Sequence, residues 1–196
     1  NSEKYLKEEL VNDSETHTEK ISHEPLGVVV NISAWNFPYN IGFNVFIPAL
    51  IAGNTVLYKP SEFTTRTGIK IIDLLYEAGV PKEVIKIIIG NGDVGAALLE
   101  LPANGYFFTG SYRTGKRIYK RVAPKMVPCQ LELGGKDPLY VSADNQNLEK
   151  VAEAALEGAF YNNGQSCCAI ERIYVHESLY DAFVSLFVEK ARGMRV

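Results

Sequence analysis

The chain of 196 residues is poor in the residues that build disulfide frameworks and metal centres, with three cysteines and three histidines. An odd number of cysteines, two of them adjacent at Cys167 and Cys168, does not suit a disulfide scaffold. His17, His23 and His176 lie far apart in the sequence, without the spacing typical of a metal site. We therefore expect no metal, and the cysteine usage predicts a reducing compartment, the cytoplasm.

Long apolar runs and long basic runs are also missing. Pro38 and Pro48, with the polar residues between them, interrupt the longest apolar stretch before it reaches the length of a membrane span. The net charge is −3 and hydrophobic residues make up 46% of the chain, which is ordinary for a soluble globular protein. We therefore expect neither a membrane nor a nucleic acid as a partner.

The two ends of the sequence carry little chemistry. The chain has no initial Met and no apolar signal-peptide core, and it stops directly after an amphipathic helical pattern. We interpret both ends as cut from a longer protein. Near the start, Tyr5, Leu6 and Leu10 fit one helical stripe, which we expect to end at residues 12–14.

Strand-like and helix-like segments alternate through the rest of the chain. The expected strands are 26–32, 55–58, 84–89, 106–108, 130–133, 139–141 and 172–175. The expected helices are 40–52, 64–78, 96–100, 114–123 and 148–159. This alternation predicts an α/β fold with a doubly wound, mostly parallel, Rossmann-like sheet and helices on both faces. In such sheets, ligands bind beyond the carboxyl ends of the strands.

The segment from Phe160 to Ala169 separates a helical pattern from a strand-like run and contains the adjacent thiols of Cys167 and Cys168. Gly164 breaks the helix and lets the backbone turn sharply, so we expect a thiol presented on a loop between two rigid elements. A cysteine is a nucleophile only as the thiolate. The alternative is that both cysteines are small buried hydrophobic residues.

Two glycine-containing turns follow predicted strands. Residues 90–95 have the spacing of a dinucleotide fingerprint, with Gly92 at its centre. The position about twenty residues further on is Gly110, with no acidic residue close by, so a pyrophosphate loop and a plain tight turn both stay open. Gly110 permits close backbone approach in the second turn, and Ser111 lies near a predicted helix N-terminus, which attracts an anion. Ser111 as a helix N-cap is the alternative, and both can hold at once.

Further polar residues lie at or near predicted strand ends. Lys59 and Glu62 can hold the two hydroxyls of a ribose, or form a solvated surface pair of little energetic value. Glu132 lies between two leucines, where partial desolvation would suit a general base; strand alternation pointing it to solvent is the alternative. Asn36 can donate its amide to a developing oxyanion, or bond its own backbone in an Asx-turn.

Taken together and in this order, these residues resemble the aldehyde dehydrogenase superfamily over roughly residues 24–196. The matching motifs are Trp35-Asn36-Phe37-Pro38, Gly53-Asn54, Lys59-Pro60-Ser61-Glu62, Phe108-Thr109-Gly110-Ser111 with Gly115, Leu131-Glu132-Leu133-Gly134-Gly135-Lys136-Asp137-Pro138, and Phe160 with Gly164-Gln165 and Cys167. The resemblance implies an NAD(P)-binding domain at 1–134, incomplete at its N-terminus, and the first segment of a second α/β catalytic domain at 135–196.

The resemblance also implies roles for the candidate residues. Cys167 is implied as the nucleophile, Asn36 as an oxyanion donor and Glu132 as the base that activates the deacylating water. The candidate cofactor-binding residues are Trp35, Lys59, Glu62, Gly92, Gly110, Ser111 and Gly115. NAD is the expected cofactor because a carboxylate at Glu62 repels a 2′-phosphate, but NADP stays possible because Lys59 tolerates one.

The implied reaction is oxidation of a small-molecule aldehyde to a carboxylic acid through a cysteine thiohemiacetal and thioester, in a homo-oligomer. Val45 stands where the family commonly has a lysine, the loop at 90–95 is shorter than usual, and the family's chain continues past this point. We therefore expect this chain alone to have little or no turnover. The alternatives are a nucleotide-binding fragment without turnover and an acylating dehydrogenase that uses coenzyme A or an acyl phosphate. Glu132 favours hydrolysis over the acylating reactions.

Overall fold

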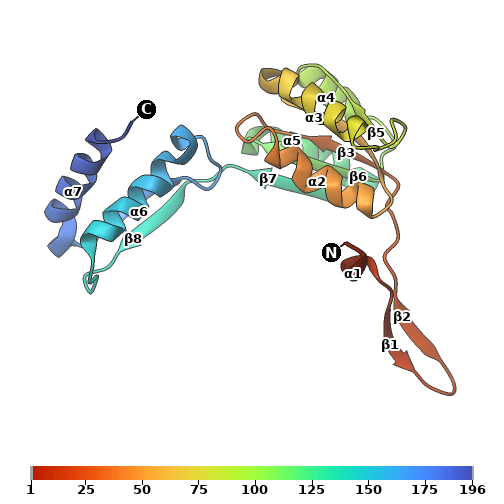
Figure 1. Cartoon of the computed structure of the whole chain (residues 1–196), viewed down its shortest axis with the longest axis horizontal. Coiled ribbons are helices and arrows are strands. Elements are labelled where there is room, and N and C mark those ends of the chain that lie inside the picture. The colour runs from red at the N-terminus through yellow and green to blue at the C-terminus, as the bar shows by residue number, and fades with distance from the viewer. Residues whose placement is uncertain (1, 196) are drawn as a thin grey trace. The chain divides into compact units, whose positions relative to one another are not determined.

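A computed structural model of the protein describes residues 2–195 and divides into two compact units between Glu132 and Leu133 (Figure 1). The expectation from the sequence placed this division after Gly134. Each unit has its own core and is described separately. No helix within residues 2–195 is both long enough and apolar enough to cross a membrane.

The first unit is built on a five-stranded sheet with the strand order β5-β4-β3-β6-β7. Its strands are β3 (Val28–Ile32), β4 (Thr55–Lys59), β5 (Ile85–Ile87), β6 (Gly105–Gly110) and β7 (Cys129–Leu133). Strand β3 is parallel to β4 and to β6, and β4 is parallel to β5. The chain builds outward from β3 to β5 and then returns to the other side of β3, so the strand order reverses between β3 and β6. A reversal of this kind marks the ligand-binding edge of doubly wound sheets.

Helices connect the strands of this sheet. They are α2 (Asn40–Ile51), the short η1 (Glu62–Thr64), α3 (Thr65–Glu77), α4 (Gly92–Leu98), α5 (Tyr112–Val122) and the short η2 (Ala123–Lys125). Right-handed crossovers put α2 and α3 on one face of the sheet, and α4 and α5 on the other. The predicted fold class, a mostly parallel α/β sheet with helices, is confirmed.

Burial follows the alternation of side chains along the central strands. Val29 of β3 and Tyr58 of β4 pack with Phe46 of α2 and with Ile71 of α3 in one buried cluster. The next residue of β3, Val30, points to the opposite face by alternation and is also fully buried. A strand with both faces covered explains why β3 reads as an almost continuous apolar run.

The N-terminal segment differs from its prediction. A short helix α1 (Ser2–Leu6) is followed by the antiparallel hairpin of β1 (Glu9–Asp13) and β2 (Thr18–Ile21), so the expected helix through Leu10 is wrong. Of the polar residues at 12–14, where we expected the helix to end, Asn12 and Asp13 belong to β1 and only Ser14 lies in the hairpin turn.

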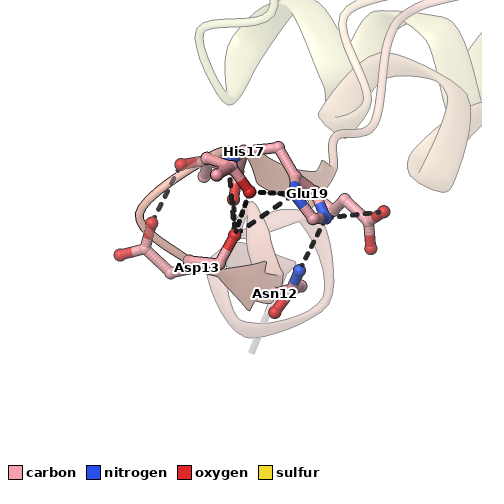
Figure 2. Close-up of polar contacts among 7 residues, drawn as sticks. Asn12, Asp13, His17 and Glu19 are labelled. Carbon is pink, nitrogen blue, oxygen red and sulfur yellow. Dashed lines mark hydrogen bonds and ion pairs between the residues drawn. The ribbon is translucent and has the colours of Figure 1, made fainter.

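Figure 2 shows the polar side chains at the tip of this hairpin. Thr18 donates to the carboxylate of Asp13 at 2.9 Å, and the side chains of Asn12 and His17 lie 3.0 Å apart. His17 also lies 3.6 Å from Glu19. These contacts close the turn between the two strands. Hydrophobic periodicity over so few residues does not predict such a turn.

The second unit contains a parallel pair of strands and two helices. Its elements are β8 (Asp137–Val141), α6 (Leu148–Phe160), η3 (Tyr161–Gly164), β9 (Ile170–Val175), η4 (Glu177–Leu179) and α7 (Tyr180–Arg192). Val141, Ala152, Ala155 and Phe183 form its buried core. The two alanines let α6 lie close to the neighbouring elements, and η3 leads from α6 into the cysteine segment.

Candidate functional site

The candidate cofactor-binding residues gather at one edge of the parallel sheet. Residues 33–39 follow β3, residues 60–62 follow β4, residues 88–91 follow β5 and Ser111 follows β6. Because parallel strands end at the same edge, these four segments lie at the carboxyl edge, where the strand order reverses. The fold therefore brings Trp35, Asn36, Lys59, Glu62, Gly110 and Ser111 to the same edge of the first unit.

Lys59 is the last residue of β4 and is only 3% exposed. Its ammonium donates to the carbonyl of Pro60 at 3.3 Å and lies 3.9 Å from the half-exposed carboxylate of Glu62. Burial lowers the pKa of Lys59, and the charge of Glu62 partly opposes this shift. The expectation of a solvated surface pair is therefore wrong for Lys59. An ammonium has three N–H donors, so the bond to Pro60 leaves donor capacity for a ligand hydroxyl or phosphate oxygen.

The fingerprint segment at 90–95 is built differently from its prediction. The helix α4 begins at Gly92, not at Ala96, because the side chain of Asn91 caps it by accepting from the backbone N–H of Asp93 at 3.1 Å. A Cβ on Gly92 would meet nothing within 4 Å. A Cβ on Gly90 would lie 2.3 Å from Val94, so Gly90 is the glycine that this turn requires.

Gly95 of α4 faces the buried lysine. A Cβ at Gly95 would lie 3.7 Å from Cε of Lys59, in ordinary van der Waals contact. The third glycine of the fingerprint therefore lines the surroundings of Lys59. Gly90 and Gly95 were not among the residues predicted for the cofactor site, although the spacing of the three glycines was the available signal.

The turn after β6 is confirmed as a helix cap. Ser111 accepts a hydrogen bond from the backbone N–H of Thr114 at 3.3 Å and is the N-cap of α5. A Cβ on Gly110 would lie 2.4 Å from the ring of Phe108, two residues earlier on the same strand, so a side chain here would require that ring to move. Gly115, one turn further on, is buried within α5. The N-terminal N–H groups of α5 face the same sheet edge as Lys59, where they suit an anion.

Asn36 and Glu132 occupy different places on the sheet. Asn36 is half-buried in the loop after the central strand β3, and its neighbour Trp35 is 44% exposed. Glu132 belongs to β7, which is separated from β3 by β6, and accepts a hydrogen bond from Gln130 at 3.2 Å. Glu132 is exposed within an alternating burial pattern, so the partial desolvation expected for it is not observed.

The cysteine segment lies in the second unit, after α6. Asn162, Asn163 and Gly164 have φ values of 51°, 57° and 74°, so three consecutive residues adopt the left-handed conformation. This run reverses the chain within one short turn. Cys167 and Cys168, which follow it, are both exposed and free of disulfides, so the alternative of buried cysteines is wrong.

The three thiols differ in their surroundings. Cys168 lies 3.2 Å from the hydroxyl of Ser166, and Cys167 is exposed and free of disulfides. Cys129, in β7, is half-buried, and burial raises its pKa. Since the thiolate is the reactive form, Cys129 is the thiol least suited to act as a nucleophile. Within residues 2–195, no group of His, Cys, Asp and Glu side chains is arranged to hold a metal ion.

Comparisons with known proteins place these features in context. A family model described as "Aldehyde dehydrogenase family" matches residues 1–196. The chain is 38% identical over 179 residues to a 4,4'-diapolycopene aldehyde oxidase from a Methylomonas species, covering 91% of this chain and 34% of that protein. It is 40% identical over 192 residues to a D-glyceraldehyde dehydrogenase (NADP(+)) from Thermoplasma acidophilum, covering 96% of this chain and 39% of the relative.

Solved structures agree with the sequence comparisons. A gamma-glutamyl-gamma-aminobutyraldehyde dehydrogenase from Burkholderia cenocepacia superposes with a TM-score of 0.90 at 37% identity, covering 94% of this chain and 38% of that chain. An indole-3-acetaldehyde dehydrogenase in complex with NAD+ superposes with a TM-score of 0.92 at 34% identity, covering 98% and 39%. The chain thus spans 34% and 39% of the length of the two relatives above.

Proposed function

Because the chain belongs to the aldehyde dehydrogenase family, we propose that it supplies the dinucleotide-binding part and the nucleophile of an enzyme that oxidises an aldehyde to a carboxylic acid. The hydride acceptor is NAD or NADP. The observation that carries this proposal is the exposed, free thiol of Cys167, directly after a turn of three left-handed residues. A loop held in this way presents its thiol to a substrate without burying it.

The proposed cofactor site is the carboxyl edge of the sheet. Lys59 and Glu62 bind the two hydroxyls of a ribose, and the N-terminus of α5 at Ser111 lies near the pyrophosphate. Gly110 and Gly115 allow the backbone to approach this ligand, and Trp35 and Gly92 border it. The fit rests on the buried ammonium of Lys59, which already donates to Pro60 and has further N–H donors for a ligand oxygen. The cofactor, when bound, accepts the hydride.

The remaining chemistry is assigned to side chains of this chain. The thiolate of Cys167 attacks the aldehyde carbonyl and forms a tetrahedral thiohemiacetal. The side-chain amide of Asn36 donates a hydrogen bond to the resulting oxyanion. Loss of hydride leaves a thioester on Cys167, and Glu132 removes a proton from the water that hydrolyses it. Hydrolysis is favoured over transfer to coenzyme A or phosphate because a carboxylate is available at Glu132.

Pulse labelling with iodoacetamide tests the proposed nucleophile. We expect Cys167 to be alkylated at least about tenfold faster than Cys129, whose pKa burial raises. NAD(P) should change the alkylation rate of Cys167, because the proposed reaction uses this thiol and the cofactor together. Mass spectrometry of the labelled peptides gives both rates, and a Cys168→Ser variant assigns the label within the adjacent pair.

Equal labelling of Cys167 and Cys129, with no effect of NAD(P), contradicts the proposal. That result supports the second candidate function, a nucleotide-binding fragment without turnover. The exposed thiols make this second candidate the weaker one, because it gives them no role.

Lys59→Met is expected to weaken binding of the dinucleotide by about 10- to 100-fold, as for the loss of a hydrogen bond from a charged donor. The same change should stabilise the fold near neutral pH, on the order of 1 kcal/mol, because it removes a buried charge. The folded-state pKa of Lys59 lies below its ordinary value of 10.5. The unfolded state therefore binds more protons between these two pKa values, and wild-type stability rises with pH there. The advantage of the variant should shrink as the pH rises toward 10.5.

Fluorescence titration with NAD(P)H and urea unfolding at neutral and alkaline pH measure these two effects. Lys70→Met is the matched control, because Lys70 pairs with Glu77 at 3.7 Å but is 56% exposed. The control should change neither affinity nor stability noticeably. Unchanged affinity in Lys59→Met would remove Lys59 from the proposed cofactor site.

A further inference from the structure

A small buried polar network lies below the loop that carries Asn36. Asn31 of β3 is 1% exposed, and its register partner on β4 is Tyr58, also 1% exposed. Ser33, at 4% exposed, donates its hydroxyl to the side-chain oxygen of Asn31 at 3.3 Å and shares a hydrogen bond with Tyr58. The amide of Asn31 donates to the backbone carbonyl of Gly42 at 3.4 Å. The network thus joins β3, β4 and α2.

All three side chains of the network are uncharged at neutral pH. Burial raises the pKa of Tyr58 to about 12, so its phenol keeps its proton. No buried side-chain nitrogen or oxygen within residues 2–195 lacks a hydrogen-bond partner. Because these polar groups are buried, removing one member leaves another unsatisfied, which costs more than the lost bond itself. The two hydrogen bonds of Asn31, at 3.3 and 3.4 Å, are long, and burial of the side chains excludes the water that would compete with them.

The network fixes both ends of the loop at 33–39. Asn31 lies near the end of β3 and Ser33 is the first residue of the loop, whereas Gly42 lies in the first turn of α2, after the loop. The bond from Asn31 to Gly42 therefore spans 11 residues and closes the loop at its base. The backbone N–H of Ser33 also donates to the carbonyl of Lys59 at 3.0 Å, which holds the start of the loop to β4.

At the start of α2, the backbone N–H of Ile41 donates to the carbonyl of Phe37 at 3.1 Å. Its N-cap, Tyr39, makes no side-chain capping hydrogen bond. Gly42 permits the close packing, because a Cβ there would lie 2.6 Å from the ring of Phe46 and 3.3 Å from the hydroxyl of Tyr58. Phe46 in turn packs edge-on against Tyr58, with ring centroids 5.2 Å apart. Contacts with Asn31 and Tyr58 therefore contribute to the position of the first turn of α2.

We propose that Asn31, Ser33 and Tyr58 are positioning residues for Asn36, holding the 33–39 loop so that the Asn36 amide reaches the oxyanion of the reaction. The proposal rests on the proposed function, in which Asn36 is the oxyanion donor. A hydrogen-bond donor stabilises developing charge only when it is already in place, and a displacement of about 1 Å costs on the order of 100-fold in rate. A buried, uncharged network at the base of the loop supplies such placement.

Tyr58→Phe tests this inference, because it removes one hydroxyl and keeps the ring in the core. In the natively expressed protein, kcat for aldehyde oxidation should fall about tenfold while KM for NAD(P) changes less than about twofold. Ser33→Ala should cause a similar loss, and the two changes combined should cost less than the product of their separate effects, since they break one network.

Tyr106→Phe is the matched control. Tyr106 is also 1% exposed and lies in a strand of the same sheet, but its hydroxyl donates to the carbonyl of Leu101 at 2.5 Å, away from the loop. This variant should lose stability to a similar degree and keep kcat. An equal fall in kcat for Tyr58→Phe and Tyr106→Phe would overturn the inference, because the effect would then be general destabilisation.

Amide hydrogen exchange separates this inference from the proposed function. Exchange of residues 33–42 should become faster in Tyr58→Phe and stay unchanged in Tyr106→Phe, whether or not an aldehyde is oxidised. If the natively expressed wild-type protein does not oxidise an aldehyde, the proposed function is contradicted but the positioning role is not. Unchanged exchange of residues 33–42 in Tyr58→Phe would overturn the positioning role, even in an active enzyme.

Discussion

Cys167→Ala should lower the rate of NAD(P)-dependent aldehyde oxidation by at least about 10⁴-fold, as expected for loss of a catalytic nucleophile. Without this sulfur, no thiohemiacetal forms, and there is no tetrahedral oxyanion from which hydride can leave. Binding of NAD(P) should persist, because every proposed cofactor contact lies in the other structural unit. The loss therefore belongs to kcat and not to cofactor affinity. Absorbance of NAD(P)H during turnover of the natively expressed protein measures it.

Cys168→Ala is the matched control for this prediction. Cys168 is the next residue, is equally free of disulfides and is also exposed, so exposure alone does not separate the two thiols. We expect Cys168→Ala to keep at least about half of the activity, because its thiol faces the hydroxyl of Ser166. If Cys168→Ala abolishes activity and Cys167→Ala does not, the assignment of the nucleophile is wrong by one residue.

Glu132→Gln should stop the reaction after hydride transfer. The variant keeps the size of the side chain but removes its ability to accept a proton from water, so steady-state turnover should fall about 10²- to 10⁴-fold. The first turnover needs no deacylation and should remain fast. We therefore expect a burst of one NAD(P)H per active thiol, followed by a slow phase.

Stopped-flow measurement of NAD(P)H, with mass spectrometry of the quenched protein, distinguishes the two phases. The acyl group should be found on the peptide that contains Cys167. Glu171→Gln is the control, because Glu171 is another glutamate on a strand, in β9, and pairs with Lys136. A Glu132→Gln variant that loses the burst as well would assign this carboxylate a role before hydride transfer.

The exposure of Glu132 bears on this prediction. Within the first unit its carboxylate is solvated and contacts Gln130, so the described structure gives it no desolvation of its own. A base in such surroundings works only if the substrate-bound enzyme places water beside it. The burst experiment is therefore a direct test of a role that the resemblance implies.

The order of strands and helices was predictable because it depends on local patterns. The apolar run in β3, the amphipathic pattern of α3 and the glycines after β6 each report backbone conformation within a few residues. The predicted boundaries failed where short polar side chains decided them. Asn91 starts α4 earlier than expected, and the polar tip at residues 14–17 makes a hairpin where a helix end was expected.

The candidate site shows the same division. Each candidate residue alone left an alternative open, but the motifs taken together and in order predicted the resemblance to the aldehyde dehydrogenase superfamily, which is confirmed. Burial was not readable, because it depends on residues distant in the chain. Lys59 is buried beside Gly95, which is 36 positions away by residue number, and both cysteines proved exposed.

Asn31 illustrates what only the tertiary structure decided. In the sequence it is one polar residue within an apolar strand, and nothing nearby says where its amide points. Its role arises from the parallel pairing with Tyr58 and from the return of α2 over the sheet, both of which are long-range. The sequence by itself determined the order of strands and helices in the parallel sheet and the family. The tertiary structure decided which polar groups are buried together, because burial depends on chain segments that local periodicity does not relate.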